Sequence, residues 1–412
     1  MPPVEGIVPP AEAPKLSRTG TSSGSRLWRR LRRRGASELE AALDALREEP
    51  HGMRTAFGLI RTALRFRIYP HDALLYELDR RPAAVGRSYL NKRSHTRLQD
   101  LLNPEAHHRR VLNKLDYHVA CVERDIPVPP VQAVVDFCPD DGRCAKLNAF
   151  RIENPAGMAA FLQTCSPGAR LVFKSIGGTY AQGLLGVTVD AHGVVDADGR
   201  RLDPAALLAH CEQRRKEGGF LIQPWLVPHP ELRAIMPGRA LGAVRVVTLL
   251  VGDEVHVPFA LVKIPVGNII FDAFNHGRTG NLLAQVDAAD GTTAIAWGPS
   301  PTYRRRLTTY AAHPDSGAAI EGFRIPCWPE VLQLVAMGAR AFPELKTLGW
   351  DVAVTSEGIF LLEANHHWDP EGPQLLLRRG YRTEMEAMVD QARGRGASGE
   401  NAAGGIRAGR VG

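Results

Sequence analysis

Residues 349–365 read GWDVAVTSEGIFLLEAN, and this stretch organises our interpretation of the chain. It predicts two short strands joined by a turn at Gly358. Asp351 opens the first strand, and Glu363 and Asn365 close the second, so an antiparallel hairpin brings their side chains to one end. Carboxylate and amide oxygens are the ligands that Mg²⁺ prefers. The stretch therefore predicts a magnesium site at Asp351, Glu363 and Asn365; the alternative is a surface hairpin with ordinary acidic residues.

The bulk composition is that of a globular protein with basic ends. The 412 residues can form two or three domains, and 44% of them are hydrophobic. The net charge is +7, of which residues 1–35 carry +6 and residues 393–412 carry +3, so the remainder carries −2. We therefore expect disordered tails at these two ranges. The basic pI belongs to the tails and does not indicate nucleic-acid binding by the folded core.

The six cysteines are scattered and contain no Cys-x-x-Cys pair. In a large chain this pattern is typical of free thiols in a reducing compartment. No stretch approaches the roughly 18 consecutive apolar residues of a membrane span, and the N-terminus lacks the apolar core of a secretory signal. These features predict a cytoplasmic protein without a membrane span.

The periodicity of apolar residues divides the chain into a helical region, residues 36–104, and a mixed region of strands and helices, residues 105–392. A capping box at Ser37–Glu40 marks the first expected helix. Helices are expected at 37–49, 53–66, 71–80, 84–101, 104–124, 204–217, 329–342 and 383–393. Strands are expected at 131–137, 171–174, 185–189, 220–226, 243–251 and 255–264, so the chain is predicted to belong to the α+β class.

A second informative segment begins with an apolar strand that ends in Lys174. A loop containing Gly177, Gly178 and Gly183 follows, and then another strand. Glycine lets backbone N–H groups approach phosphate oxygens, and Lys174 can reach a phosphate or a purine nitrogen. The segment is neither a Walker A loop nor a G-x-G-x-x-G fingerprint. A hairpin with a flexible tip is an equally weighted alternative.

The apolar run at 220–226 offers backbone groups of residues 223–226 to the edge of a planar base, and Glu231 can accept from ribose hydroxyls. Taken alone, this run is better explained as a core strand followed by a proline-rich turn. Arg245 stands alone in the β-branched strand 243–248 and needs an anionic partner, because an unpaired buried charge is costly. That partner is either a phosphoryl group in transfer or a carboxylate in a structural salt bridge.

In this order, these segments resemble the ATP-grasp superfamily, and most nearly its sugar-transfer associated branch, which is related to α-L-glutamate ligases. The likeness covers about residues 105–392 and is most specific in the closing hairpin. It implies an ATP-grasp fold with two subdomains, at 105–222 and 223–392, after the helical region. The cofactors that it implies are ATP and Mg²⁺, or Mn²⁺ in its place.

The resemblance implies a role for each matching residue. Lys114 and Lys174 hold the phosphates and base, and Arg245 steadies the transferred phosphoryl group, with Lys174 and Arg245 as the catalytic pair. Gly177, Gly178 and Gly183 belong to a glycine lid over the phosphates. Gln223, Trp225 and Leu226 belong to the hinge at the adenine, and Glu231 accepts from the ribose. The magnesium ligands are Asp351, Glu363 and Asn365.

The chain departs from the branch in the segment expected to line the acceptor substrate. Lys263 stands where arginine is common, Asp272-Ala273 where an Asp-Asn pair is common, and Ala364 where glycine is frequent. Candidate substrate residues there are Lys263, Asn275, Arg278 and His366. Neighbouring strand residues face opposite ways, so His366 and His367 are not expected to bind one metal, and at most one of them faces the substrate.

These roles predict an ATP- and Mg²⁺-dependent ligase that joins a carboxylate to an amine or thiol through an acyl phosphate, in polysaccharide, peptide or secondary-metabolite biosynthesis. No papain-like cysteine motif indicates a covalent nucleophile. The alternatives are a small-molecule or sugar phosphotransferase and a nucleotide-binding partner without turnover. The expected partners are small carboxylate and amine substrates, and a homodimer is one candidate assembly.

Overall fold

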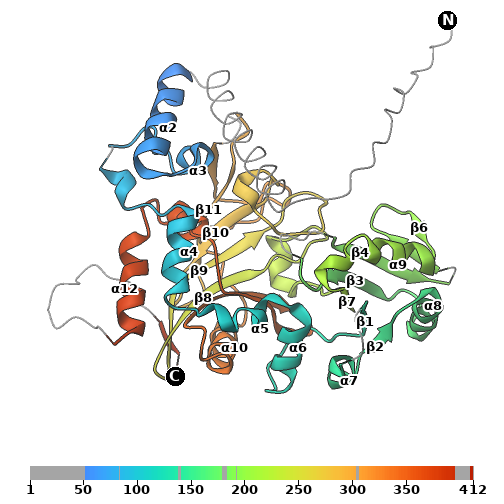
Figure 1. Cartoon of the computed structure of the whole chain (residues 1–412). Helices are drawn as coiled ribbons and strands as arrows, with labels where there is room; N and C mark the ends of the chain where they lie inside the picture. Colours follow the sequence, from blue (N-terminus) through green and yellow to red (C-terminus); the bar gives the residue numbers. More distant parts are fainter. Residues whose placement is uncertain are drawn as a thin grey trace, which may run out of the picture.

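The computed structural model describes residues 52–394, except 83, 138–140, 179–182, 192 and 303–305, together with a strand at 409–411. Within these residues the chain forms two sheets, each flanked by helices (Figure 1). The predicted α+β class is confirmed. No helix in the described ranges is long and apolar enough to cross a bilayer. The predicted tail at 1–35, the predicted helix at 37–49 and most of the predicted tail at 393–412 lie outside the described residues.

The smaller sheet is built from the first half of the chain and is antiparallel except for the parallel pair β1 and β2. Helices α8 (Pro155–Thr164) and α9 (Pro204–Glu212) cover one face through Met158, Phe161 and Leu207. The strand order is β2 (Phe150–Ile152), β1 (Ala133–Val135), β7 (Phe220–Pro224), β3 (Arg170–Ser175), β4 (Leu185–Asp190), β5 (Gly193–Asp196) and β6 (Arg201–Leu202). The predicted boundary after residue 222 falls within β7.

The larger sheet is antiparallel throughout and contains the closing hairpin at residues 349–365. Its strand order is β12 (Leu307–Tyr310), β11 (Thr293–Pro299), β10 (Leu282–Val286), β9 (Glu254–Ile264), β8 (Val244–Val251), β13 (Thr347–Thr355) and β14 (Gly358–Asn365). A further strand, β15 (Gly409–Val411), pairs with β9. These three residues fall within the range 393–412 that is expected from the sequence to be a tail.

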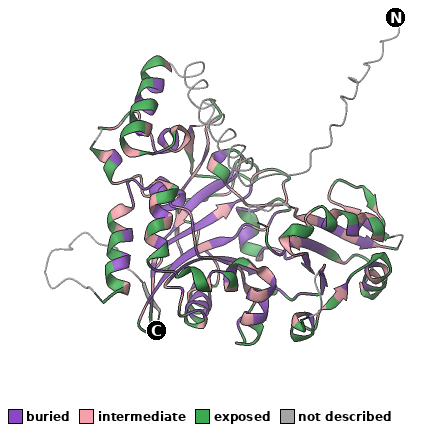
Figure 2. Cartoon of the chain, viewed as in Figure 1, coloured by how far each residue is buried: buried purple, intermediate pink, exposed green. Residues whose placement is uncertain are grey.

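Helices cover both faces of the larger sheet, and its strands are largely buried (Figure 2). Helix α10 (Trp328–Ala341) packs on the face that carries Val246 and Trp350. The other face carries Val247 and packs against the helical region and the last helices. These elements are α2 (Gly52–Phe66), α3 (Pro70–Leu75), η1 (Val85–Arg87), α4 (Lys92–Asp100), α11 (Glu371–Leu376) and α12 (Arg382–Ala392). Strand alternation therefore places Arg245 and Asp351 on the face opposite α10.

The connection between the helical region and the smaller sheet differs from the single helix expected at 104–124. It consists of η2 (Glu105–His107), α5 (Arg109–Leu112) and α6 (Lys114–Val122). The break falls at Asn113, whose backbone is extended and whose side chain accepts from the N–H groups of Leu115 and Asp116. An asparagine that caps a new helix competes with continuation of the previous one. The sequence prediction also missed α7 (Arg143–Lys146), α8 and α11.

Candidate functional site

The closing hairpin has the register that the sequence predicts. Asp351 on β13 pairs with Glu363 on β14, and a bulge follows directly between Asp351 and Val352. The Asn365 side-chain amide donates to Glu363 Oε1 at 3.3 Å and to the Gly349 carbonyl at 3.2 Å. Because the amide nitrogen points to these acceptors, the Asn365 Oδ1 is left as an acceptor beside two carboxylates. This all-oxygen donor set fits Mg²⁺.

Two cations from neighbouring strands already contact Asp351. Arg245 on β8 donates to its two carboxylate oxygens at 2.5 Å and 2.7 Å, and Lys263 on β9 donates to Oδ2 at 2.9 Å. Burial by itself would raise the pKa of Asp351, but the attraction of Arg245 and Lys263 outweighs it and holds the pKa well below the usual range. Asp351 is therefore ionised at neutral pH despite an exposed fraction of 4%.

The position of Arg245 depends on a glycine in the facing strand. A Cβ on Gly349 would lie 3.3 Å from Arg245 Cδ and 2.8 Å from Trp368 Cβ. The sequence left two partners open for Arg245, and the structure pairs it with a carboxylate, Asp351. Each carboxylate oxygen has two lone pairs, so the same Asp351 can still accept from a second direction.

Lys263 is predicted from the sequence to line the acceptor substrate, but in the structure it bonds to Asp351 together with Arg245. Besides its bond to Asp351, its Nζ lies 3.6 Å from Asp272 Oδ2. Asp272 in turn accepts from the Ala243 N–H at 3.0 Å. The sequence prediction missed this contribution of Asp272. A signal was available in Lys263, which is a lone lysine in an apolar strand and, like Arg245, needs an anionic partner.

Lys174 connects the smaller sheet to this cluster. Burial, with some repulsion from Lys114, lowers its pKa to about 8, and the carboxylate of Glu363 partly offsets that decrease. Lys114, at the start of α6, donates to the Gly178 carbonyl at 2.6 Å. Lys174 of the smaller sheet therefore interacts electrostatically both with Lys114 and with Glu363 of the larger sheet.

The glycine loop is anchored at its described ends, and residues 179–182 lie outside the described part. The Gly177 N–H donates to the Glu217 carbonyl at 2.8 Å, and Ser175 Oγ donates to Glu217 Oε2 at 2.5 Å. Gly183 has φ +76°, and a Cβ there would lie 2.5 Å from Arg214 Cδ. Glu217 lies in η3 (Arg215–Glu217), far from the loop in sequence, so no local motif indicated that it anchors the loop.

The expected adenine hinge uses some of its polar groups internally. The buried Gln223 amide donates to His118 Nε2 at 2.9 Å and to the Pro129 carbonyl at 3.0 Å. The Trp225 N–H donates to the Arg170 carbonyl at 2.8 Å, which removes it from the donors predicted to read a base. The physical reason is that pairing with β3 continues past the end of β7. Glu231 is exposed, in η4 (Pro230–Ala234).

Two of the candidate substrate residues, Asn275 and Arg278, are exposed at the turn η5 (Asn275–Gly277). The turn is fastened by Thr279 Oγ1, which donates to the Ala273 carbonyl at 2.6 Å, and by the Asn281 amide, which donates to the same carbonyl at 2.9 Å. The polar segment after Asp272 therefore forms a closed loop that presents exposed side chains.

His366 and His367 do not follow the predicted alternation. Strand β14 ends at Asn365, so both histidines lie in a turn, and their ring centroids are 4.2 Å apart. Burial and the neighbouring rings of His367 and His108 lower the pKa of His366 to about 3. A ring this weakly basic is poorly suited to act as the general base considered from the sequence.

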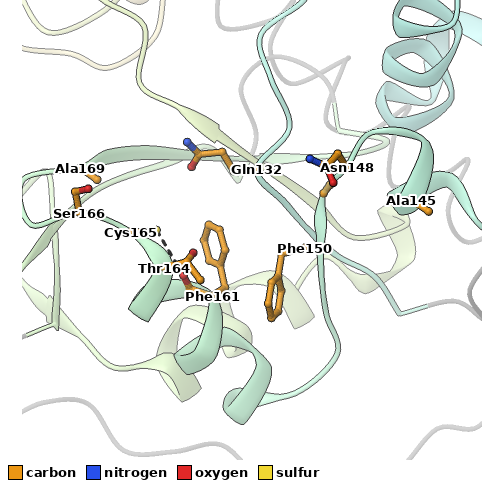
Figure 3. Close-up of a pocket in the computed structure, with 10 residues that line it drawn as sticks. Gln132, Ala145, Asn148, Phe150, Phe161, Thr164, Cys165, Ser166 and Ala169 are labelled. Carbon is orange, nitrogen blue, oxygen red and sulfur yellow. Dashed lines mark hydrogen bonds between the residues drawn. The ribbon is translucent and has the colours of Figure 1, made fainter.

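A cavity of about 610 Å³ lies elsewhere, beside α8 (Figure 3). Phe150 and Phe161 line it, and Cys165 Sγ donates to the Phe161 carbonyl at 3.6 Å. None of the predicted site residues lines this cavity. We therefore place the candidate site at the charged cluster of Arg245, Lys263, Asp272, Asp351 and Glu363, because cations and carboxylates lie together there.

One family model matches most of the chain. A family model described as sugar-transfer associated ATP-grasp matches residues 93–389. No curated protein matches the chain in sequence.

Solved structures similar to the chain include the ATP-grasp ligase PsnB complexed with minimal precursor, at 14% identity and TM-score 0.35 over 70% of this chain and 64% of that chain. A biotin carboxylase from Campylobacter jejuni matches at 10% identity and TM-score 0.41 over 73% and 50%. D-alanyl-alanine synthetase A from Vibrio cholerae matches at 13% and 0.36 over 69% and 64%. The chain spans less than two thirds of each of these proteins.

Proposed function

Because this chain belongs to the sugar-transfer associated ATP-grasp family, we propose that it is an ATP- and Mg²⁺-dependent ligase that joins a carboxylate to an amine or thiol. The observation that carries the proposal is that Arg245 and Lys263 converge on Asp351, which pairs with Glu363 across β13 and β14. A nucleotide between two sheets needs cations for its phosphates and oxygens for its metal. Both kinds of group are present in this one place.

The fixed charges suit a reaction that gathers negative charge. Arg245 and Lys263 are held by hydrogen bonds to Asp351, so their positive charges need no reorganisation as a phosphoryl group moves. Lys174 is positively charged below pH about 8 and can contact phosphate oxygens. Asp351, Glu363 and Asn365 would hold Mg²⁺, which neutralises phosphate charge when bound.

The proposed reaction has two steps. A substrate carboxylate oxygen attacks the γ-phosphorus of ATP, the bond to ADP breaks, and an acyl phosphate forms. An amine nitrogen (or a thiol sulfur) then attacks the acyl carbon, loses its proton, and inorganic phosphate leaves. The protein contributes position and field rather than a covalent nucleophile. We place this chemistry in polysaccharide, peptide or secondary-metabolite biosynthesis, and in the cytoplasm, where ATP is supplied.

Adding hydroxylamine to turnover reactions distinguishes the ligase from a phosphotransferase. Hydroxylamine intercepts an acyl phosphate and gives a hydroxamate, whereas a kinase that phosphorylates a hydroxyl gives none. The experiment screens carboxylate and amine pairs for Mg²⁺-dependent ADP release and then tests each active acid with hydroxylamine. ADP release without any hydroxamate would favour the phosphotransferase. ATP binding without ADP release for any pair would favour a non-catalytic partner.

A further inference from the structure

Three histidine rings meet at the junction between the helical region and the end of β14. His108 precedes α5, and His366 and His367 follow Asn365. The ring centroid of His108 lies 4.1 Å from that of His366 and 5.0 Å from that of His367. One ring nitrogen of each residue lies within 4.8 Å of one from each of the others. The three rings therefore offer nitrogens to a common centre.

The hydrogen bonds fix the tautomers of two of these rings. His108 Nε2 lies 2.8 Å from the Asn103 carbonyl, and His367 Nε2 lies 2.7 Å from Asp100 Oδ1. Both partners accept only, so each Nε2 carries the proton and each Nδ1 keeps a lone pair. Metal-binding histidines are usually oriented in this way, with the second nitrogen bonded to a carbonyl or carboxylate. The ring of His366 has no hydrogen bond to any residue that the structure describes.

The scaffold around the rings is buried and closely bonded. Asn103 has an exposed fraction of 0%. Its amide donates to the His366 carbonyl at 2.7 Å and to the Thr347 carbonyl at 2.8 Å, and its Oδ1 accepts from the Thr347 N–H at 3.1 Å. The same asparagine thus positions His108 through its carbonyl and His366 through its side chain. A site whose ligands are fixed by such partners is suited to a defined coordination geometry.

We propose that His108, His366 and His367 bind a transition-metal ion, Zn²⁺ in the first instance, at a site separate from the Mg²⁺ oxygens. Imidazole nitrogens suit Zn²⁺, whereas Mg²⁺ takes oxygen ligands. Tetrahedral Zn–N bonds place ligand nitrogens about 3.4 Å apart, which small side-chain movements reach from the present separations. The side chain of His367 is 28% exposed, which gives the ion access from solvent. The inference does not depend on the ligase function.

A second cluster, His71, Asp72 and His276, provides the comparison site. Its ring nitrogens already face carboxylates: His71 Nε2 lies 3.1 Å from Asp72 Oδ1, and His276 Nδ1 lies 3.1 Å from Glu371 Oε2. In this cluster the carboxylates lie against these ring nitrogens. Metal binding at the His108 cluster should therefore persist when this second cluster is altered.

The test is a titration of the chelator-stripped full chain with ZnCl₂ and CoCl₂ in excess MgCl₂. We expect one ion per chain by elemental analysis and the visible absorption of tetrahedral Co²⁺. His366→Ala should weaken binding at least about 100-fold, and Asp100→Asn, which removes the carboxylate partner of His367, about 10- to 100-fold. His71→Ala is the matched control and should bind like the wild type.

Folding of each variant is checked by circular dichroism, and His367→Asn replaces His366→Ala if the latter does not fold. Wild-type protein that binds no stoichiometric Zn²⁺, or equal affinity in wild type and the histidine variant, overturns the proposal. Loss of binding in His71→Ala instead would assign the ion to the second cluster and also overturn it.

Discussion

Arg245 and Asp351 face each other across β8 and β13, and two hydrogen bonds, of 2.5 Å and 2.7 Å, join them. Their side chains are 18% and 6% exposed, so the pair is largely removed from water. An ion pair in this position is costly to break on one side, because the remaining charge is left buried.

Arg245→Met should lower the free energy of unfolding by about 3 kcal/mol, because Asp351 loses two hydrogen bonds and, among the described residues, keeps Lys263 as its hydrogen-bonded cation. Urea denaturation measures this loss. Arg201→Met is the matched control, since Arg201 also bonds both oxygens of an aspartate, Asp190, but is 52% exposed. That change should cost much less than the change at Arg245, because solvent screens an exposed ion pair. Equal losses in the two variants would show that the Arg245 pair contributes no more than a surface salt bridge.

Glu363→Gln should reduce Mg²⁺-dependent ADP formation by at least about 100-fold, because an amide cannot supply the same charge to the metal. The matched control is Glu357→Gln, an exposed glutamate in the turn of the same hairpin, which should retain wild-type activity. Steady-state assays over a range of MgCl₂ concentrations measure both variants. Wild-type activity in Glu363→Gln would remove Glu363 from the metal site.

The affinity for ATP should fall as pH rises through about 8, because Lys174 loses its positive charge there. The sign follows from the lowered pKa: the ammonium form, which attracts phosphate, dominates below that pH and the neutral form above it. Isothermal titration with ATP at increasing pH measures the effect. Lys174→Arg keeps its charge across the range, so its affinity should show a flatter profile. Identical profiles in the two proteins would exclude Lys174 as the titrating group.

Gly349→Ala should destabilise the protein by about 1–3 kcal/mol, because its Cβ would lie 2.8 Å from Trp368 Cβ in a packed region. The same change at Gly157 in α8 meets no atom closer than 3.6 Å and should stabilise by up to about 1 kcal/mol. Thermal unfolding of the two variants should therefore shift in opposite directions. A neutral Gly349→Ala variant would mean that Trp368 and Arg245 have room to move.

Most of the second half of the fold could be predicted from local patterns. The strands β8, β9 and β14 lie within one or two residues of their expected bounds, because alternation and turns act over short distances. Strand β13 ends as expected but begins at Thr347, before Asp351. Prediction was poorer at 104–124, where one asparagine cap divides the helix, and in α8, whose cap at Asn154 was overlooked. Both asparagines carry a local capping signal, which apolar periodicity alone does not include.

The sequence by itself determined the closing hairpin and the pairing of Asp351 with Glu363, because a turn and a two-residue period are enough to set register. Only the tertiary structure decided which cations contact Asp351, since Arg245 and Lys263 come from strands about 100 residues earlier in the chain. It also brought together the rings of His108, His366 and His367, although strand alternation predicts that His366 and His367 face opposite ways. The physical reason is that contacts between distant segments depend on how sheets and helices pack, and no local period encodes that packing.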